Sequence, residues 1–306
     1  MARVIPFRPA YLALHESGEL AARAVQAEAR LADCDLCARY CRVNRFETLE
    51  RVVCRTGADA IVHSHGPHHG EEDPLSGWCG SGTIFFSWCN LRCVYCQNWE
   101  ISRNGTGLQV RGAELASIML ELQDKGCHNI NLVSPSHVVA QVLEAMLIAS
   151  KRGLRLPLVY NTGGYDSLES LGLLDGVIDI YMPDMKYGND ELAFKHSKIK
   201  DYVEVNHAAV LEMHRQVGDL QLDPHRIARR GLIIRHLVLP GEMKSTEEVI
   251  AFVAAGISTG SYFNLMDQYR PCYRASEFPP LDRPLTESEY ERALAICRAY
   301  GLTPQR

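Results

Sequence analysis

The sequence lacks any long hydrophobic run. No apolar stretch reaches the roughly 18 residues that a membrane-spanning helix needs. The first twenty residues, MARVIPFRPAYLALHESGEL, also lack the combined basic flank, long apolar stretch and small-residue cleavage site of a signal peptide. We therefore expect a cytoplasmic protein with no membrane partner.

A strong charge of one sign is also missing. The 306 residues carry 32 Lys and Arg against 37 Asp and Glu, a formal net charge of −5. Without a global basic field, a nucleic-acid partner is not expected. Hydrophobic residues make up 46% of the chain, which is enough to build a sizeable core.

Cysteine, in contrast, is abundant. Eight of the eleven cysteines lie between Cys34 and Cys96, whereas Cys127, Cys272 and Cys297 stand alone. Disulfide frameworks are typical of small secreted domains, and this chain is long and shows no export signal. The clustered thiols therefore indicate metal ligands, and the three isolated ones indicate small buried hydrophobic residues.

From Thr83 onward, short apolar runs alternate with amphipathic stretches, which is the pattern of repeated strand–helix units. The predicted strands cover residues 83–88, 129–134, 156–162, 177–183, 231–240 and 261–269. The predicted helices cover residues 112–125, 138–150, 168–174, 190–198, 201–217, 249–255 and 286–300. Capping patterns begin at Ser245 and at Thr286, before the last two helices. The predicted fold class is α/β: a partial (βα)6 TIM-like barrel of parallel strands (83–306), preceded by a Cys/His-rich N-terminal module (1–82).

Cys89, Cys93 and Cys96 directly follow the first predicted strand, where barrel enzymes build their active sites. Three thiolates in an eight-residue loop can hold three irons of a [4Fe–4S] cube. The fourth iron then lacks a protein ligand, and such an open position distinguishes a reactive metal from a structural one. A zinc site or a closed electron-transfer cluster would need a fourth ligand, and Cys79 lies ten residues before Cys89.

This spacing, with Tyr95 just before the last cysteine, resembles the motif of radical S-adenosylmethionine enzymes. The wider chain resembles the activating enzymes of pyruvate formate-lyase and related glycyl radical enzymes, above all a subgroup of activating-enzyme-like proteins. The matching segments are GPHHGEEDPLSG (66–77), GSGTIFFSWCNLRCVYCQNWEIS (80–102), NLVSPSH (131–137), YMPDMKY (181–187) and RHLVLPG (235–241). The resemblance implies that the open iron chelates S-adenosylmethionine, whose one-electron cleavage yields a hydrogen-abstracting 5′-deoxyadenosyl radical.

The resemblance also implies contacts to S-adenosylmethionine at the strand ends. Where the family has a Gly-Gly-Glu turn that grips the methionine amino group, this chain departs and has Ser134-Pro135-Ser136-His137. The hydroxyls of Ser134 and Ser136 and the carbonyls of the turn could still accept from an ammonium group, and a helix N-cap by Ser136 is the alternative.

Three further polar residues lie near the ends of later strands. Asp184 and Lys186 resemble the family's Asp-x-Lys pair, in which the lysine meets the methionine carboxylate, and a plain buried ion pair is the alternative. Arg235 lies in an apolar strand, where a charge is costly unless paired, and the resemblance implies an anion or substrate contact. Asn161, next to the Gly163-Gly164 turn, is a further candidate contact to the cofactor, and the neighbouring His236 is predicted to be structural.

Four cysteines of the N-terminal part, Cys34, Cys37, Cys41 and Cys54, have the count that closes a structural zinc site or an iron–sulfur cluster. We expect a bound metal there, either zinc or an auxiliary [4Fe–4S] cluster, with free buried thiols as the alternative. The later run from His63 to Asp73 has the composition of a metal site. We expect it instead to line the substrate entrance or to contact the cluster loop.

The leading functional hypothesis is a radical S-adenosylmethionine oxidoreductase that takes hydrogen from a substrate, such as a glycine of a glycyl radical enzyme. Cys79 or Tyr95 is a candidate second hydrogen donor. A small metabolite or a peptide is the alternative substrate. An iron–sulfur electron-transfer or carrier protein is the non-enzymatic alternative, and it would have only closed four-cysteine sites. The cluster would need an electron donor such as flavodoxin or ferredoxin, while the protein positions the cofactor and excludes water.

Overall fold

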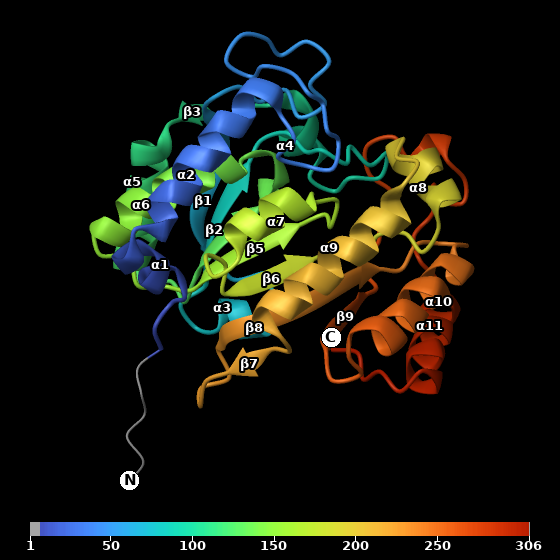
Figure 1. Ribbon diagram of the computed structural model, residues 1–306. Helices are drawn as coiled ribbons and strands as arrows, with labels where there is room; N and C mark the ends of the chain where they lie inside the picture. Colours follow the sequence, from blue (N-terminus) through green and yellow to red (C-terminus); the bar gives the residue numbers. More distant parts are fainter. Residues whose placement is uncertain (1–6, 306) are drawn as a thin grey trace.

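Six parallel strands form the centre of the molecule (Figure 1), in a computed structural model that describes residues 7–305. In pairing order they are β2 (Ser81–Phe86), β4 (Ile130–Val133), β5 (Leu158–Thr162), β6 (Ile180–Pro183), β8 (Ala228–Leu237) and β9 (Tyr262–Met266). Their order in space follows their order in the chain, because each crossover returns to the next position in the sheet. The predicted strands are confirmed.

Three antiparallel strands border this parallel sheet. They are β1 (Ala60–His68), which pairs with β2, β3 (Leu108–Val110), which pairs with β1, and β7 (Gln221–Leu222), which pairs with β8. In the strand pairing of residues 7–305, β9 joins β8 and no ladder links it to β2. The sheet is therefore an open partial barrel.

The two faces of the sheet bury different side chains. The in-register row Ile84, Leu132, Tyr160 and Tyr181 belongs to the main hydrophobic core, beneath the helices. Alternate positions point to the barrel interior, where Val159, Ile180, Met182 and Ile233 meet Leu75 of α3 (Asp73–Ser76). Because side chains alternate along a strand, Asn131 and Asn161 share this inner face.

The helices that follow the strands lie close to their predicted ranges. They are α5 (Gly112–Asp124), α6 (Val139–Lys151), α7 (Leu168–Leu174), α8 (Asp190–Ser197), α9 (Tyr202–Val217), α10 (Met243–Phe252) and α11 (Glu287–Ala299). The predicted capping box before α11 is confirmed, since the Thr286 side chain accepts from the Glu289 amide and Glu289 accepts from the Thr286 amide. None of the helices in residues 7–305 is long and apolar enough to cross a membrane.

One helix start was predicted wrongly. Helix α10 begins at Met243, so Ser245 lies inside it and caps nothing. The Ser245 hydroxyl instead accepts from the amide of Gly188, at 2.8 Å. The capping pattern in the sequence therefore reflects a tertiary contact.

The N-terminal part wraps around the barrel. Helices α1 (Tyr11–Ser17) and α2 (Glu19–Ala29), drawn in blue in Figure 1, pack on the same core as α6. The Tyr11 hydroxyl donates to the carbonyl of Leu156 at 2.9 Å. Residues 34–59 form neither helix nor strand and lie beside the three-cysteine loop, which leads into α4 (Trp99–Asn104).

Candidate active site

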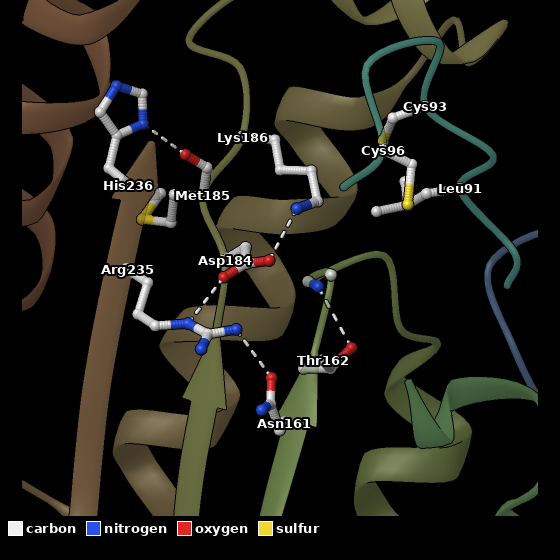
Figure 2. A network of polar contacts seen from close by, with 12 residues as sticks. Leu91, Cys93, Cys96, Asn161, Thr162, Asp184, Met185, Lys186, Arg235 and His236 are labelled. Carbon is white, nitrogen blue, oxygen red and sulfur yellow. Dashed lines mark hydrogen bonds and ion pairs between the residues drawn. The ribbon is translucent and has the colours of Figure 1, made fainter. Parts of the chain in front are cut away.

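A cavity of about 260 Å³ opens above the carboxyl ends of the parallel strands. Its lining includes all three cysteines of the loop after β2, together with Ser134, Asn161, Asp184, Lys186 and Arg235. These residues follow or end five different strands, and Figure 2 shows the Arg235–Asp184–Lys186 chain in the same view as Cys93 and Cys96. The topology thus brings together side chains that lie up to about 150 residues apart in the sequence.

The three-cysteine loop (residues 87–98) is irregular and held by specific contacts. Trp88 and Arg92 have φ values of 70° and 59°, in the left-handed region that non-glycine residues rarely occupy. The amide of Leu91 donates to the Cys89 sulfur at 3.4 Å. This loop conformation places all three thiols in the lining of one cavity, and the two left-handed residues strain the backbone locally.

Hydroxyl groups reach two of the three sulfurs. Ser197 donates to the Cys93 sulfur at 3.2 Å, and the Ser102 hydroxyl lies 3.3 Å from the Cys96 sulfur. Burial and then the neighbouring Cys93 raise the pKa of Cys89 and that of Cys96, the latter to about 11. The thiols of Cys89 and Cys96 are therefore protonated until a cation compensates their charge, as expected of ligands that metal binding deprotonates.

The donor set fits an iron–sulfur cube with one open iron. Three soft thiolates converge on one cavity, whose remaining lining offers no fourth cysteine. Within residues 7–305, no three His, Cys, Asp or Glu side chains are grouped as they would be around a single metal ion. A cube keeps its thiolates farther apart than a single ion does, because irons and sulfides lie between them.

Asp184 joins the two cations of the cavity. Its carboxylate lies 2.6 Å from the Lys186 ammonium and 2.8 Å from the Arg235 Nε (Figure 2). Burial opposes its ionisation, but Arg235 and then Lys186 outweigh burial and hold the pKa of Asp184 below its usual value. Burial likewise opposes the charge on Lys186, and Asp184 outweighs it, so the pKa of Lys186 is raised. Both groups are charged at neutral pH.

Arg235 has more hydrogen-bonding partners than the sequence indicated. Its Nη2 donates to the Asn161 side-chain oxygen at 2.7 Å, and its Nη1 lies 3.2 Å from the Glu71 carboxylate. Together with the Asp184 contact, every guanidinium nitrogen has a partner. Lys186 has only the Asp184 carboxylate as a partner within the described residues, and an ammonium has three donors. Lys186 is thus the better placed of the two to bind an anion.

Sequence reasoning missed the role of Glu71. Its carboxylate enters the barrel from the loop before α3 and accepts from Asn131 at 2.9 Å and from Asn161 at 3.2 Å. The neighbouring Glu72 accepts from Asn264 of β9 at 2.7 Å. The only signal in the sequence was a pair of acids after a histidine run.

The two serines that were predicted to contact the cofactor lie in different surroundings within the turn after β4. Ser134 lines the cavity with φ at 59°, whereas Ser136 is buried and bonds the Thr162 hydroxyl at 2.9 Å. The N-cap alternative for Ser136 is wrong, since α6 begins at Val139. His137 contacts the Ser87 carbonyl at 3.0 Å, and burial lowers its pKa to about 3.

The remaining histidines are structural or exposed. His236 bonds the Met185 carbonyl and the Thr246 hydroxyl, as predicted for a structural residue (Figure 2). His63 and His65, on β1, contact Thr106 and Glu121 separately. No residue from His63 to Asp73 lines the cavity itself, but Glu71 bonds Asn161 and Arg235, which do, so the place of this run at the substrate entrance or the cluster loop stays a prediction.

The four N-terminal cysteines lie together, beside the cluster loop. Cys34, Cys37 and Cys54 are buried and Cys41 is half-buried. Burial and then the Cys54 thiol raise the pKa of Cys37, and Cys41 and Cys34 add to the shift. All eleven cysteines are unpaired, as expected for a chain without a disulfide framework.

Of the two candidate second hydrogen donors, one lies at the cavity and the other does not. Tyr95 lines the cavity and is buried, whereas Cys79 is absent from the cavity lining, and its amide lies 3.2 Å from His128 Nε2. Of the isolated cysteines, Cys127 and Cys297 are buried as predicted, and Cys272 is half-buried.

Comparison with known proteins finds a matching family model and a relative of similar sequence. A family model described as the Radical SAM superfamily matches residues 83–253. An uncharacterized protein of Methanocaldococcus jannaschii, MJ0674, is 33% identical over 280 residues, which cover 88% of this chain and 75% of that protein.

Two solved structures show weaker likeness. A domain of pyruvate-formate lyase-activating enzyme from Bacteroides vulgatus has a TM-score of 0.38 at 12% identity, covering 53% of this chain and 88% of that one. A radical SAM methyltransferase from Sphaerobacter thermophilus has a TM-score of 0.47 at 15% identity, covering 73% and 65%. Both scores are below 0.5, so neither likeness bears on the reaction. The family match spans more than half of the chain and includes the three-cysteine loop, Asp184, Lys186 and Arg235, and the chain therefore belongs to the radical S-adenosylmethionine superfamily, whose members bind a [4Fe–4S] cluster and S-adenosylmethionine.

Proposed function

We propose that the protein is an oxidoreductase that reductively cleaves S-adenosylmethionine and abstracts hydrogen from a substrate at the cavity above the strands. When bound, the cluster and cofactor supply the one-electron cleavage that gives the 5′-deoxyadenosyl radical. The observation that carries this proposal is that Cys89, Cys93 and Cys96 line one cavity with the Asp184–Lys186 pair.

The protein's own residues bind and orient. Cys89, Cys93 and Cys96 would each ligate one iron of the cluster. Lys186 would hold the carboxylate of S-adenosylmethionine, since two of its three ammonium donors have no partner within residues 7–305. The Ser134 hydroxyl and backbone would accept from the amino group. This chain has no carboxylate in that turn, so the amino group would be held by neutral acceptors alone.

Asp184 and Arg235 would act as positioning residues for this arrangement. Asp184 fixes Lys186, while Arg235 fixes Asp184 and is in turn held by Asn161 and Glu71. Asn161 lines the cavity as well, so its amide could meet the cofactor on its free side. Ser136 would act only through Thr162, which it contacts.

A glycine of a protein is the substrate that the activating-enzyme-like motifs favour. Radical modification of a small metabolite or a peptide is the second candidate. The eleven free thiols support a reducing compartment such as the cytoplasm, with flavodoxin or ferredoxin as the electron donor.

The four N-terminal cysteines would hold a second metal centre. Four thiolates are the right number for zinc and for an auxiliary [4Fe–4S] cluster. Because no three of these side chains, as placed in residues 7–305, surround a single-ion position, the cluster is the better match. The support is that three of the four thiols are buried, and that the neighbouring thiols add to the rise that burial causes in the pKa of Cys37 and of Cys54. Such a closed site would stabilise the chain without binding S-adenosylmethionine.

Anaerobic reconstitution tests the proposal. Protein with reconstituted cluster, dithionite and S-adenosylmethionine should form 5′-deoxyadenosine, measured by chromatography and mass spectrometry. A Cys93→Ala variant, which removes one ligand of the three-cysteine loop, should form none. A carrier protein would form no 5′-deoxyadenosine in either case, and that result would refute the enzymatic proposal. Transfer of deuterium from labelled candidate substrates into 5′-deoxyadenosine would then separate protein glycine from a metabolite.

A further inference from the structure

Two arginines hold the backbone of the three-cysteine loop. Arg39 Nε donates to the Asn90 carbonyl at 2.8 Å, and Arg39 Nη2 donates to the Leu91 carbonyl at 3.4 Å. Arg103 Nη2 donates to the next two carbonyls, those of Arg92 and Cys93. Four consecutive carbonyls therefore point at two guanidinium groups, whose fixed fork of donors suits such paired acceptors.

Arg39 belongs to the four-cysteine segment, not to the barrel. It lies two residues after Cys37, and its backbone N–H partly offsets the rise in the pKa of the Cys37 thiol. The amide of Tyr40 donates to the Cys37 carbonyl at 3.0 Å and closes the turn. The backbone of Arg39 thus contacts one group of thiols, while its side chain holds the loop that carries the other.

Contacts beyond the loop backbone extend this connection. Arg39 Nη2 also reaches the Ser197 carbonyl at 3.5 Å, and the Ser197 hydroxyl donates to the Cys93 sulfur. The guanidinium lies over the Tyr165 ring, 5.6 Å from its centroid, where a cation and an aromatic face attract each other. Arg39 is therefore fixed in place on several sides.

A second arginine joins the same segment to the other wall of the cavity. Arg45 is 3% exposed, and its Nη1 donates to the Cys34 sulfur at 3.6 Å and to the His137 carbonyl at 2.9 Å. His137 ends the turn that carries Ser134, and its ring contacts the Ser87 carbonyl next to the cluster loop. Both walls of the cavity are thus tied to the four-cysteine segment.

The four-cysteine segment is held by turn hydrogen bonds and by contacts to the barrel, without regular secondary structure. Residues 34–59 contain no helix or strand, and Tyr40, Arg42, Arg51 and Arg55 have φ values between 43° and 62°. Left-handed backbone is strained for residues with a side chain, so each of these positions destabilises the segment. A centre that cross-links four thiolates would offset this cost, as metal binding does in small metal-dependent folds.

We propose that the four-thiolate centre of Cys34, Cys37, Cys41 and Cys54 braces the radical-generating loop, with Arg39 as the positioning residue that connects the two. This proposal rests on the proposed second metal centre and on the proposed function of the three-cysteine loop. Loading of the N-terminal site then controls the geometry of a cluster to which it contributes no ligand.

The test compares Arg39→Ala and Arg39→Lys with a matched control, Arg42→Ala. Arg42 lies in the same segment, but its side chain pairs with Asp33 and Asp35 and does not contact the cluster loop. Zinc and iron are counted by elemental analysis, and the reduced cluster is examined by electron paramagnetic resonance with and without S-adenosylmethionine. Binding of the cofactor is titrated by the same signal.

Arg39→Ala should retain the wild-type melting temperature within a few degrees and keep the metal of the N-terminal site. Its spectrum in the presence of S-adenosylmethionine should change, and its affinity for the cofactor should fall about tenfold, the scale seen when groups behind metal ligands are removed. Arg39→Lys, which retains one donor for the Asn90 carbonyl, should recover part of the affinity. Arg42→Ala should match the wild type. A wild-type spectrum and affinity in Arg39→Ala would overturn the brace.

The double variant Cys37→Ser/Cys54→Ser provides an independent arm. It should lose either zinc or a set of irons beyond those of the first cluster, and its remaining cluster should be lost faster under a chelator. Metal absent from the wild-type N-terminal site would refute the proposal. If the wild-type spectrum does not respond to S-adenosylmethionine, the proposed function fails as well. If the wild-type spectrum responds to S-adenosylmethionine and the Arg39→Ala spectrum responds equally, only the proposal that the N-terminal centre braces the loop fails. This conclusion does not depend on whether the cysteine variant folds.

Discussion

At the scale of single residues, the cavity depends on one shared carboxylate. Asp184 accepts from Lys186 and from Arg235, and the latter is further held by Asn161 and Glu71. Buried charges are tolerated only when they are paired and hydrogen-bonded, and this chain of contacts meets that condition. Lys186 retains two ammonium donors for a ligand, because Asp184 is its only side-chain partner within the described residues.

Removal of the Lys186 charge should weaken cofactor binding selectively. Lys186→Ala should lower the affinity for S-adenosylmethionine by about tenfold or more, the cost of removing a hydrogen bond to a charged group. The cluster itself should still assemble, because its three ligands are untouched. Titration of the cluster's paramagnetic signal with the cofactor measures this, and iron content is the control. Equal affinity in the variant would exclude Lys186 as a contact.

The hydroxyl of Ser197 should set the reduction potential of the cluster. It donates to the Cys93 sulfur, and a hydrogen bond to a cluster sulfur favours the reduced, more negative state. Ser197→Ala should therefore shift the potential to a more negative value, measured by redox titration with paramagnetic resonance. Ser117→Ala, at an exposed serine of α5, serves as the control and should leave the potential unchanged.

At the scale of elements, the close approach of two segments needs a glycine. A Cβ placed on Gly163, after β5, would lie 2.2 Å from the Leu91 side chain of the cluster loop. Leu91 is buried, so it cannot simply turn away. The sequence showed two adjacent glycines after a strand but not the partner that requires one of them, because the partner lies in a different strand–helix unit.

Gly163→Ala should displace the cluster loop and reduce the iron retained by the reconstituted protein. Adding Leu91→Ala should restore iron content, because it removes the group that the new methyl would meet. The single Leu91→Ala variant, which leaves a cavity of the kind that costs about 2–5 kcal/mol, serves as the reference for stability. If the double variant retained no more iron than Gly163→Ala, the steric explanation would be wrong.

The strands were predictable from local pattern, whereas several contacts around them were not. Buried parallel strands read as continuous apolar runs, and β6 and the first three residues of β5 are of this kind. Glu71 was missed because its partners Asn161 and Arg235 are 90 and 164 residues away in the chain. Ser136 and Ser245 were assigned to caps or ligands because a serine near a helix start commonly caps it, and here each bonds another element.

At the scale of the whole molecule, three buried neutral histidines make the fold sensitive to acid. Burial lowers the pKa of His137 to about 3 and the pKa values of His196 and His236 to about 4, below the value of about 6.5 in an unfolded chain. Below pH 6.5 the unfolded chain binds protons that the folded chain does not, so stability rises with pH through this window. The contribution is complete above about pH 6.5.

Lowering the pH from 7.5 to 5 should cost about 2 kcal/mol for each of these histidines. Urea denaturation at the two pH values measures the loss. His236→Gln, whose side chain can keep a hydrogen bond at the Thr246 hydroxyl or the Met185 carbonyl, should make the dependence on pH shallower. A pH dependence identical to that of the wild type would show that His236 does not contribute.

The carboxylate of Glu71 also limits how far the protein can be truncated from its N-terminus. It originates before the first barrel strand, yet it balances a guanidinium inside the barrel and bonds two interior amides. A fragment that begins at Thr83 would retain every ligand of the three-cysteine loop. It would nevertheless bury Arg235 with Asp184 as the one remaining counter-carboxylate. The side-chain amide of Asn131 would lose the carboxylate to which it donates, and the edge of β2 that β1 covers would become exposed. Expression of the barrel alone should therefore give an aggregating product, and a usable shortened enzyme must begin upstream of β1.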